Sequence, residues 1–146
     1  MRMWKVIVSP EEDKDAWERF VQQNIVAIGW CCRELDSALP VQQFMRMCQG
    51  DWVVAHLSSK RSGVPFLAVG IGRLTSSYHE VDTRNDGTWN GNIRRQFTVD
   101  WVSMRRLPMP DLFRRCNYRT TVCPLSDEVA ADILRRYGVA SEQFGR

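Results

Sequence analysis

The chain has 146 residues and a formal net charge of +3, with 44% hydrophobic and 25% charged residues. These values are typical of one globular domain with a single sizeable core, so we expect residues 1–146 to form one domain. No apolar run approaches the ~20 residues of a membrane-spanning helix, and the N-terminus lacks a signal-peptide core, so we expect a cytoplasmic protein with no membrane partner.

The first part of the chain predicts a strand, a helix and a second strand. Residues 3–9 (MWKVIVS) have the density of β-branched residues that favours a strand. Ser9 and Pro10, followed by three acidic residues, predict a helix start, because serine caps, proline and acidic side chains all favour the first turn. This helix ends near Asn24 in our prediction. Residues 25–30 (IVAIGW) then predict a strand that ends in a tryptophan.

A second helix and two strands are predicted next. Apolar residues recur at helical spacing between Val41 and Cys48, and Gly50 follows as a stop. Residues 51–57 (DWVVAHL) and 66–77 (FLAVGIGRLTSS) predict strands separated by a turn. Two glycines interrupt the second of these strands, and glycine inside a strand often marks a bulge or a close backbone approach.

The last part of the chain predicts a loop, two strands and a final helix. Residues 79–92 are polar and predict a long loop, and residues 93–104 alternate as a strand does. Residues 105–113 predict a short turn or helix, and 119–125 a short strand. Residues 126–137 predict a capped helix. The sum is an α+β fold, in which about five to six strands curl into a barrel flanked by two to four helices.

The sequence lacks the motifs of common catalytic and cofactor sites. It has no G-x-x-x-x-G-K-[ST] loop, no complete dinucleotide-binding glycine pattern, no H-E-x-x-H and no G-x-S-x-G. Only two histidines are present, and none of the five cysteines lies in a C-x-x-C pair, so we expect no metal site. We expect reduced, mostly buried thiols, no cofactor and no enzymatic activity. Cys31 and Cys32 are the best candidate nucleophiles if the protein is an enzyme.

Positive charge is concentrated in one segment. Residues 94–119 contain seven arginines and two acidic residues, a balance of +5 that leaves −2 for the rest of the chain. The planar guanidinium of arginine suits phosphate and stacks on bases, although a solvated surface without a ligand is the alternative interpretation. The residues that we predict to contact phosphate are Arg73, Arg94, Arg95, Arg105, Arg106 and Arg119.

Six tryptophans are a high number for 146 residues. Trp30 follows a predicted strand and Trp89 lies in a polar segment, where a large aromatic side chain needs either packing or a ligand. Two converging aromatic rings make a slot for a flat ring, and stacking a base contributes ~1–3 kcal/mol. Tyr78, near the end of a predicted strand, is a candidate third wall. The tryptophans that we predict to lie in the core are Trp4, Trp17, Trp52 and Trp101.

A set of ordered segments resembles a known family. The segments are WKVIVSP, IVAIGW, GDWVVAH, AVGIGRLTSSY and FTVDWV, within residues 3–125, and they resemble EVE-like domains of the PUA-like superfamily. The similarity is in particular to the N-terminal specificity domains of modification-dependent restriction systems. The later part, FTVDWVSMRRLP, is also similar to YTH domains, which read N6-methyladenine in RNA. The resemblance implies a PUA-like, EVE-like barrel.

The resemblance also implies a binding site. In these families a flipped modified base sits in an aromatic cage at the end of the barrel. The tryptophan after the second strand matches Trp30, and Trp89 is the match for a wall from the loop before the V-D-W strand. Cys31 matches the position whose backbone contacts the base in these families. Ser9 matches a position whose side chain contacts the base or a phosphate. Pro10 replaces an asparagine that touches adenine in YTH domains. The recognised base could therefore be 5-methylcytosine or a hydroxymethylated base instead of N6-methyladenine.

These observations predict a non-catalytic domain that recognises a methylated or hydroxymethylated base, in DNA rather than RNA, by flipping it into an aromatic cage. Phosphate contacts would offset the few kcal/mol that base extrusion costs. A nuclease or NTPase effector of the same system is an expected partner. Three alternatives stay open: a PUA-like or YTH-like reader of modified RNA, a small-molecule or enzymatic protein with Cys31 as a reactive thiol, and a protein-binding domain whose aromatic residues are all core.

Overall fold

The computed structural model of the protein describes residues 2–8, 16–29, 33–57, 66–85, 91–112, 115 and 121–139. The elements in chain order are β1 (Met3–Ile7), α1 (Ala16–Gln23), β2 (Ile25–Ile28), η1 (Arg33–Leu35), α2 (Leu39–Met45), β3 (Trp52–Leu57), β4 (Leu67–Leu74), β5 (His79–Asp82), β6 (Ile93–Ser103), β7 (Leu107–Pro108), η2 (Pro110–Leu112), β8 (Val122–Pro124) and α4 (Asp127–Arg136).

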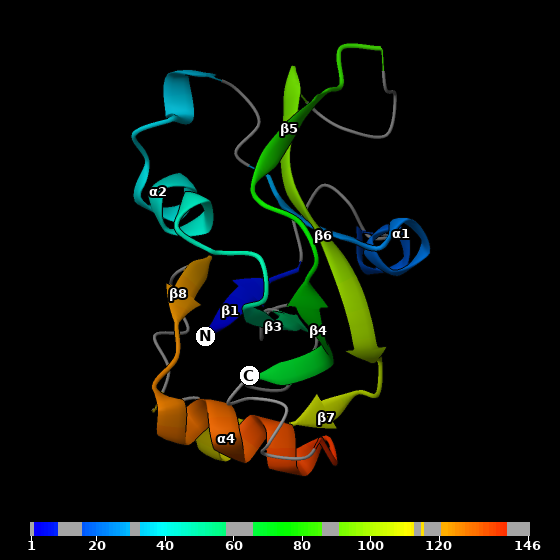
Figure 1. Cartoon of the computed structure of the whole chain (residues 1–146), viewed down its shortest axis with the longest axis vertical. Helices are drawn as coiled ribbons and strands as arrows, with labels where there is room; N and C mark the ends of the chain where they lie inside the picture. The colour runs from blue at the N-terminus through cyan, green and yellow to red at the C-terminus, as the bar shows by residue number, and fades with distance from the viewer. Residues whose placement is uncertain are drawn as a thin grey trace.

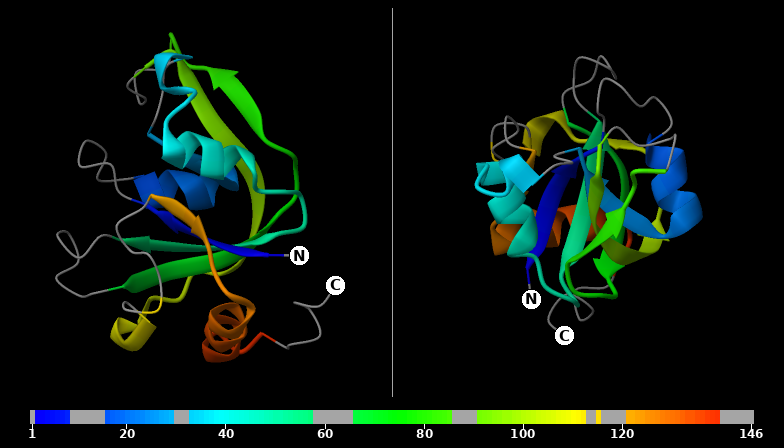
Figure 2. Two further views of the ribbon diagram at one scale, coloured as in Figure 1. Left: turned by 90° about the vertical axis from the view of Figure 1, so that its left-hand side faces the viewer. Right: turned by 90° about the horizontal axis from the view of Figure 1, so that it is seen from above.

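The strands form one mixed sheet that curls into a half-barrel. Its order is β2-β6-β4-β3-β1-β8, with β5 paired to β6 and β7 to β4. β1 and β3 run parallel, and the other pairs among the described strands are antiparallel. β5 and the start of β6 lie at one end of the molecule, and β7 and α4 lie at the other (Figure 1). Figure 2 shows β6 bending between these two ends. The predicted α+β architecture is confirmed.

The middle of the sheet is buried on both faces. On β3, Val53 and Ala55 pack into a core that includes residues of α1 and α2, whereas Trp52 and Val54 pack into a second core that includes α4. Because both faces are covered, β3 is apolar at nearly every position instead of alternating. None of the described helices is long and apolar enough to span a membrane.

Most of the predicted elements are confirmed, including several caps. α1 ends at Gln23, and the φ of +54° at the following Asn24 lies in the left-handed region that follows many helix ends. The Ser126 hydroxyl accepts a hydrogen bond from the Val129 amide at the start of α4. Gly138, with a φ of +74°, follows the end of that helix. The predicted helix start at Ser9 and Pro10 falls outside the described residues.

The expected long loop at residues 79–92 is partly wrong, because its first four residues form β5. This strand is polar and only half-buried, so its composition resembles that of a loop. Its backbone hydrogen bonds come from pairing with Ile93–Gln96 of β6, a tertiary contact that local composition does not predict. The segment 105–113, predicted as a short turn or helix, contains the 3-10 helix η2 and also the short strand β7, which was not predicted.

The four tryptophans predicted as core residues contribute to the two cores. Trp4 and Trp52 are fully buried, and Trp101 is 9% exposed. Trp17 is half-buried and meets Trp101 edge to face at a centroid distance of 4.8 Å. Trp101 also donates from Nε1 to the Phe20 carbonyl of α1 at 3.1 Å. These contacts attach α1 to the inner face of β6.

Asp51 joins the N-terminus of the chain to the segment that precedes β3. Its carboxylate accepts hydrogen bonds from the Arg2 amide, the Cys48 amide and Nε1 of Trp4, at 3.2, 2.9 and 3.0 Å. A carboxylate that accepts several N–H groups satisfies donors that would otherwise be buried without partners. The Gly50-Asp51 pair of the resembling segment GDWVVAH therefore has a structural role.

The two glycines of β4 lie where neighbouring groups approach the backbone. A Cβ added at Gly70 would lie 2.7 Å from Cη2 of Trp17 and 2.8 Å from the Ser103 carbonyl oxygen. A Cβ at Gly72 would lie 2.6 Å from the Asp100 carbonyl oxygen. The pairing of β4 with β6 also shifts register between Ile71 and Gly72. Both features expected of these glycines, close approach and a bulge, are confirmed.

We predict that Gly70→Ala lowers the free energy of unfolding by about 1–3 kcal/mol, because the methyl group overpacks the contact between Trp17 and β4. Gly29→Ala is the matched control, since a Cβ at Gly29 has no neighbour within 4 Å. It should stay within about 0.5 kcal/mol of the parent protein. Chemical denaturation measures both values, and equal stabilities of the two variants would contradict the prediction.

His56 is a buried histidine that favours the neutral form. Its ring stacks on Phe66 at a centroid distance of 4.8 Å, and its Nε2 finds no hydrogen-bond partner among the described residues. Burial and the nearby Lys5 ammonium lower the pKa of His56 from 6.5 to about 3. The unfolded chain therefore binds a proton below about pH 6.5 that the folded chain does not bind until about pH 3.

Folding stability should consequently fall as the pH decreases from about 6.5 towards 3, by up to a few kcal/mol from this group, because protons favour the unfolded chain in that range. Replacement of His56 by Phe keeps a ring against Phe66 and removes the titration. Denaturation at about pH 7 and pH 5 should show a smaller loss of stability in His56→Phe than in the parent. An equal loss in both proteins would show that His56 is not the responsible group.

Candidate nucleic-acid interface

The strand pairing brings β2, β5 and the start of β6 together at one end of the sheet. Ile28 of β2 and Glu80 of β5 pair with Arg95 of β6 from opposite sides. Gly29 follows directly on β2, and Asn92 precedes β6. The two segments that carry the predicted cage tryptophans therefore join the described structure at this end, which we call the Arg95 end. The predicted site residues that lie outside the described residues are Ser9, Trp30, Cys31, Trp89 and Arg119.

Arg95 continues the inward-facing side of β6. Phe97, Val99 and Trp101 point into the core at every second position, and Arg95 occupies the same side two residues before Phe97. Its side chain is completely buried, with 0% exposure. The interior of the half-barrel thus changes from apolar to charged at the Arg95 end.

The buried guanidinium of Arg95 bonds to groups from separate parts of the chain. Nη2 forms an ion pair with Oδ1 of Asp36 at 2.5 Å, in the segment between η1 and α2. Nη1 donates to the Tyr78 hydroxyl at 3.2 Å and lies 3.4 Å from Oε2 of Glu80. Burial opposes the charge, but the hydrogen bonds to Asp36 and Tyr78 outweigh it and raise the pKa of Arg95. The guanidinium therefore stays charged inside the protein.

Glu80 connects this buried group to the surface. Its carboxylate accepts a hydrogen bond from the Tyr78 hydroxyl at 2.6 Å and forms an ion pair with Arg33 of η1 at 2.5 Å. Partial burial opposes ionisation, but the hydrogen bonds from Tyr78 and Arg33 outweigh it and lower the pKa of Glu80. Positive and negative groups alternate from Arg33 through Glu80 and Arg95 to Asp36. This arrangement, with Tyr78, is here named the Arg95 network.

Tyr78 is half-buried and belongs to this network. Its ring meets Phe44 and Phe97 edge to face at centroid distances of 6.2 and 5.9 Å. Burial, followed by the hydrogen bond to Glu80, raises the pKa of Tyr78 to about 12. The hydroxyl thus remains protonated at neutral pH and donates to Glu80. Its ring contributes to the core as well as lying at the Arg95 end.

The predicted phosphate-binding arginines do not form one patch. Arg94 is half-buried and donates from Nε to Gln96, whereas Arg105 and Arg106 are exposed beyond the other end of β6. A strand rises about 3.3 Å per residue, so roughly 36 Å of chain separates Arg94 from Arg105. Arg73 is half-buried, 5.5 Å from the ring centroid of Trp52.

Arg95 itself has a different place from the one expected. A guanidinium with 0% exposure does not reach a phosphate in solvent, so Arg95 is removed from the set of direct phosphate contacts. Two arginines that we did not single out from the sequence are more exposed at the same end, with side-chain exposures of 65% for Arg33 and 71% for Arg84. Each pairs with a carboxylate of β5, Arg33 with Glu80 and Arg84 with Asp82.

An open cleft of about 400 Å³ lies at the Arg95 end. It has charged walls and two aliphatic side chains, and such a surface accepts polar ligands more readily than apolar ones. Its lining residues are Arg33, Glu80, Val81, Asp82, Arg84, Asn92 and Ile93.

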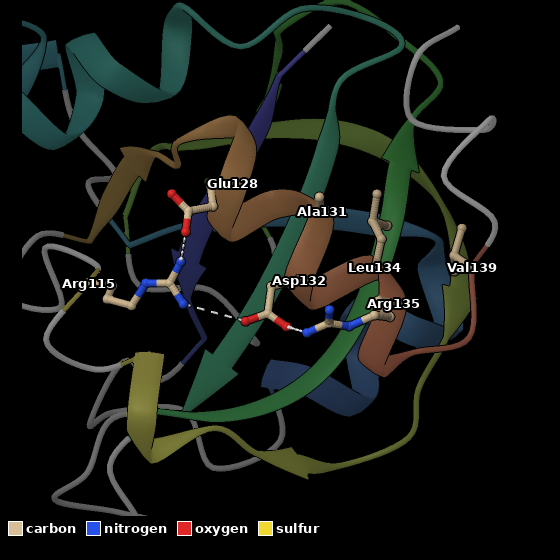
Figure 3. Close-up of a pocket in the computed structure, with 7 residues that line it drawn as sticks. All are labelled: Arg115, Glu128, Ala131, Asp132, Leu134, Arg135 and Val139. Atoms are coloured by element: carbon tan, nitrogen blue, oxygen red, sulfur yellow. Dashed lines mark hydrogen bonds and ion pairs between the residues drawn. The ribbon is translucent and has the colours of Figure 1, made fainter.

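A second cavity, of about 740 Å³, lies beside α4 at the opposite end of the molecule (Figure 3). Its arginines are already neutralised, since Arg115 contacts Glu128 at 3.1 Å and Asp132 at 3.5 Å, and Arg135 pairs with Asp132. The described residues contain no group of three or more His, Cys, Asp or Glu side chains that is placed to hold a metal ion. Of the described cysteines, Cys123 is buried and Cys48 is exposed.

No protein-family model and no curated protein sequence matches this chain. Solved structures do match it. A hypothetical protein from Leishmania major superposes with a TM-score of 0.64 at 14% identity, covering 94% of this chain and 95% of that one. The YTH domain of a Zygosaccharomyces rouxii protein, solved in complex with N6-methyladenosine RNA, gives a TM-score of 0.60 at 14% identity, with 93% and 86% covered. The chain has a YTH-like fold. A protein from Agrobacterium tumefaciens gives 0.61 at 15% identity, with 97% and 96% covered.

The sequence contained a pattern that identifies Arg95 as an inward-facing residue. Extending the alternation of Trp101, Val99 and Phe97 by one further step places Arg95 on the core side. A buried arginine requires acidic partners, but Asp36 and Glu80 are distant in sequence and only the fold brings them near. The role of Arg33, which depends on its contact with Glu80, has no comparable pattern in the sequence.

We predict that Glu80→Gln lowers the free energy of unfolding by about 1–3 kcal/mol, because it weakens the compensation of the buried Arg95 charge. The matched control is Asp82→Asn, two residues along β5, whose carboxylate is 57% exposed and pairs with the exposed Arg84. An exposed pair of this kind contributes little to stability. Chemical denaturation compares the two variants, and a larger loss in Asp82→Asn would contradict our assignment.

Proposed function

We propose that this protein binds nucleic acid and recognises a methylated or hydroxymethylated base, without catalysing a reaction on it. The observation that carries the proposal is the YTH-like fold, since YTH domains similar in structure were solved with N6-methyladenosine RNA and with m6A. In this proposal a base leaves the helical stack and binds in an aromatic cage at the Arg95 end. Trp30 and Trp89 are its proposed walls, with Tyr78 beside them.

The arrangement of the Arg95 end supports this proposal. The segment after β2 and the segment between β5 and β6 both join the structure there, next to the cleft. A flipped base is bound by stacking between side chains, and two separate segments would provide such side chains from two directions. Ser9 and Cys31 keep their proposed contacts with the base or with the backbone beside it.

Phosphate contacts would provide affinity that does not depend on sequence. We propose Arg33, Arg84 and Arg94 for this role next to the cage, because they come from the segments that surround the cleft or adjoin it. A longer nucleic acid would also reach other arginines, and its binding would fall steeply with salt. The arginines proposed for this second group are Arg73, Arg105, Arg106 and Arg119.

Two nucleic acids fit the proposal. The resemblance to specificity domains of restriction systems favours modified DNA, and such a protein would act with a nuclease or NTPase effector. The solved YTH domains with bound N6-methyladenosine favour modified RNA as the second candidate. Pro10 stands where the adenine-contacting asparagine of YTH domains would be, which favours a base other than N6-methyladenine.

The test is binding by fluorescence anisotropy to matched oligonucleotides that differ in one base. The panel contains unmodified, N6-methyladenine, 5-methylcytosine and 5-hydroxymethylcytosine DNA, and N6-methyladenine RNA. We predict that one modified oligonucleotide binds at least about fivefold tighter than its unmodified partner, and that Trp30→Ala removes this preference, because a base loses ~1–3 kcal/mol of stacking.

Circular dichroism and thermal melting accompany the binding curves, so that a folded Trp30→Ala protein is compared with the parent. Equal binding of every oligonucleotide by the parent would contradict the proposal. An unfolded Trp30→Ala protein would instead place Trp30 in the core, where loss of a tryptophan costs about 3–5 kcal/mol. Trp89→Ala then provides the second test of the cage.

A further inference from the structure

We propose that Arg95 is a positioning residue. It holds the two proposed base-binding segments, the one after β2 and the one between β5 and β6, in a fixed position relative to each other. This inference rests on the proposed function, because it assigns a role in base recognition to a residue that does not touch the base. Arg95 pairs with β2 on one side and with β5 on the other, the two strands from which these segments start, and it is fully buried, so that its effect on a ligand is exerted through its partners.

The backbone of Arg95 fixes one end of each segment. It pairs with Ile28, the last residue of β2, and with Glu80 of β5. The chain that carries Trp30 therefore starts from a residue paired with Arg95. The chain that carries Trp89 runs from β5 to β6, the two strands that pair at Glu80 and Arg95.

The side chain of Arg95 fixes the far end of the first segment. After leaving β2 at Ile28, the chain reaches Asp36, whose carboxylate binds Nη2 of Arg95 at 2.5 Å. Between these positions Arg33 binds Glu80, so the same segment is also tied to β5. The segment that contains Trp30 thus begins and ends at Arg95, and a middle residue of it contacts the strand that leads towards Trp89.

A guanidinium is suited to this role, and an ammonium is not. Arg95 uses Nη1 towards Tyr78 and Glu80, and Nη2 towards Asp36, in directions set by one rigid plane. A lysine has a single nitrogen and would not reach groups on both sides with the same geometry. Binding sites depend on such support, because a small displacement of a contact residue weakens selective binding.

The test uses Asp36→Asn, which removes the negative charge that pairs with Arg95. The Asp36 side chain is 49% exposed, so this substitution leaves no cavity in the core. Its matched control is Asp111→Asn, since the Asp111 carboxylate is 57% exposed and pairs with Arg136 of α4 at the other end of the molecule. Arg95→Lys is the second variant, which keeps the charge and loses the planar fork. The probes are the tightest-binding modified oligonucleotide of the panel and its unmodified partner.

The measured quantity is the ratio of the two Kd values, unmodified over modified. We predict that Asp36→Asn lowers this ratio at least about threefold, while affinity for the unmodified oligonucleotide changes less than about twofold, because phosphate contacts determine it. Arg95→Lys should lower the ratio in the same way, and Asp111→Asn should leave it unchanged. A merely structural role would lower both affinities together, in proportion to the fraction unfolded.

The outcomes separate this inference from the function on which it rests. A parent protein that does not prefer any modified oligonucleotide overturns both. A parent that shows a preference, together with folded Asp36→Asn protein that keeps the parental ratio, overturns the positioning role of Arg95 and leaves the proposed function standing. A selective loss in Asp36→Asn and not in Asp111→Asn supports the inference, whether or not Arg95→Lys folds.

Discussion

The charge of Arg95 has to be balanced inside the protein, and this requirement determines the structure of one end of the half-barrel. A buried charge is tolerated only when partners surround it with good geometry. Asp36, Glu80 and Tyr78 provide them, and they come from the segment after β2 and from the region of β5. The two segments are therefore held next to β6 by the neutralisation of one side chain.

The two ends of the molecule use arginine in different ways. At the α4 end, Arg115, Arg135 and Arg136 pair with carboxylates of the same region, so their charge is largely neutralised at the surface. Exposed pairs of this kind add little to stability and are screened by salt. At the Arg95 end the exposed Arg33 and Arg84 also pair with carboxylates, those of Glu80 and Asp82. The difference is the fully buried guanidinium of Arg95, which the α4 end lacks among the described residues and which shares Glu80 with Arg33.

Sequence patterns predicted the elements whose structure depends on local chemistry. The cap at Ser126 and the end of α1 before Asn24 are examples, since neighbouring residues determine each of them. The strand β5 was not predicted, because its hydrogen bonds come from β6. Counting the arginines of residues 94–119 suggested one basic surface. The number of arginines does not show that alternate side chains of β6 point to opposite faces. It also does not show that the two ends of β6 are far apart.

In our proposal nucleic acid binds at the Arg95 end. This claim is tested most directly by amide NMR, in which the modified oligonucleotide that binds most tightly is titrated into labelled protein and the shifted resonances are assigned. We predict that the largest shifts lie in the residues that adjoin β2, β5 and the start of β6, including Gly29, Arg33, Arg84 and Asn92. Shifts concentrated in α4 and β7, with these resonances unchanged, would contradict the account.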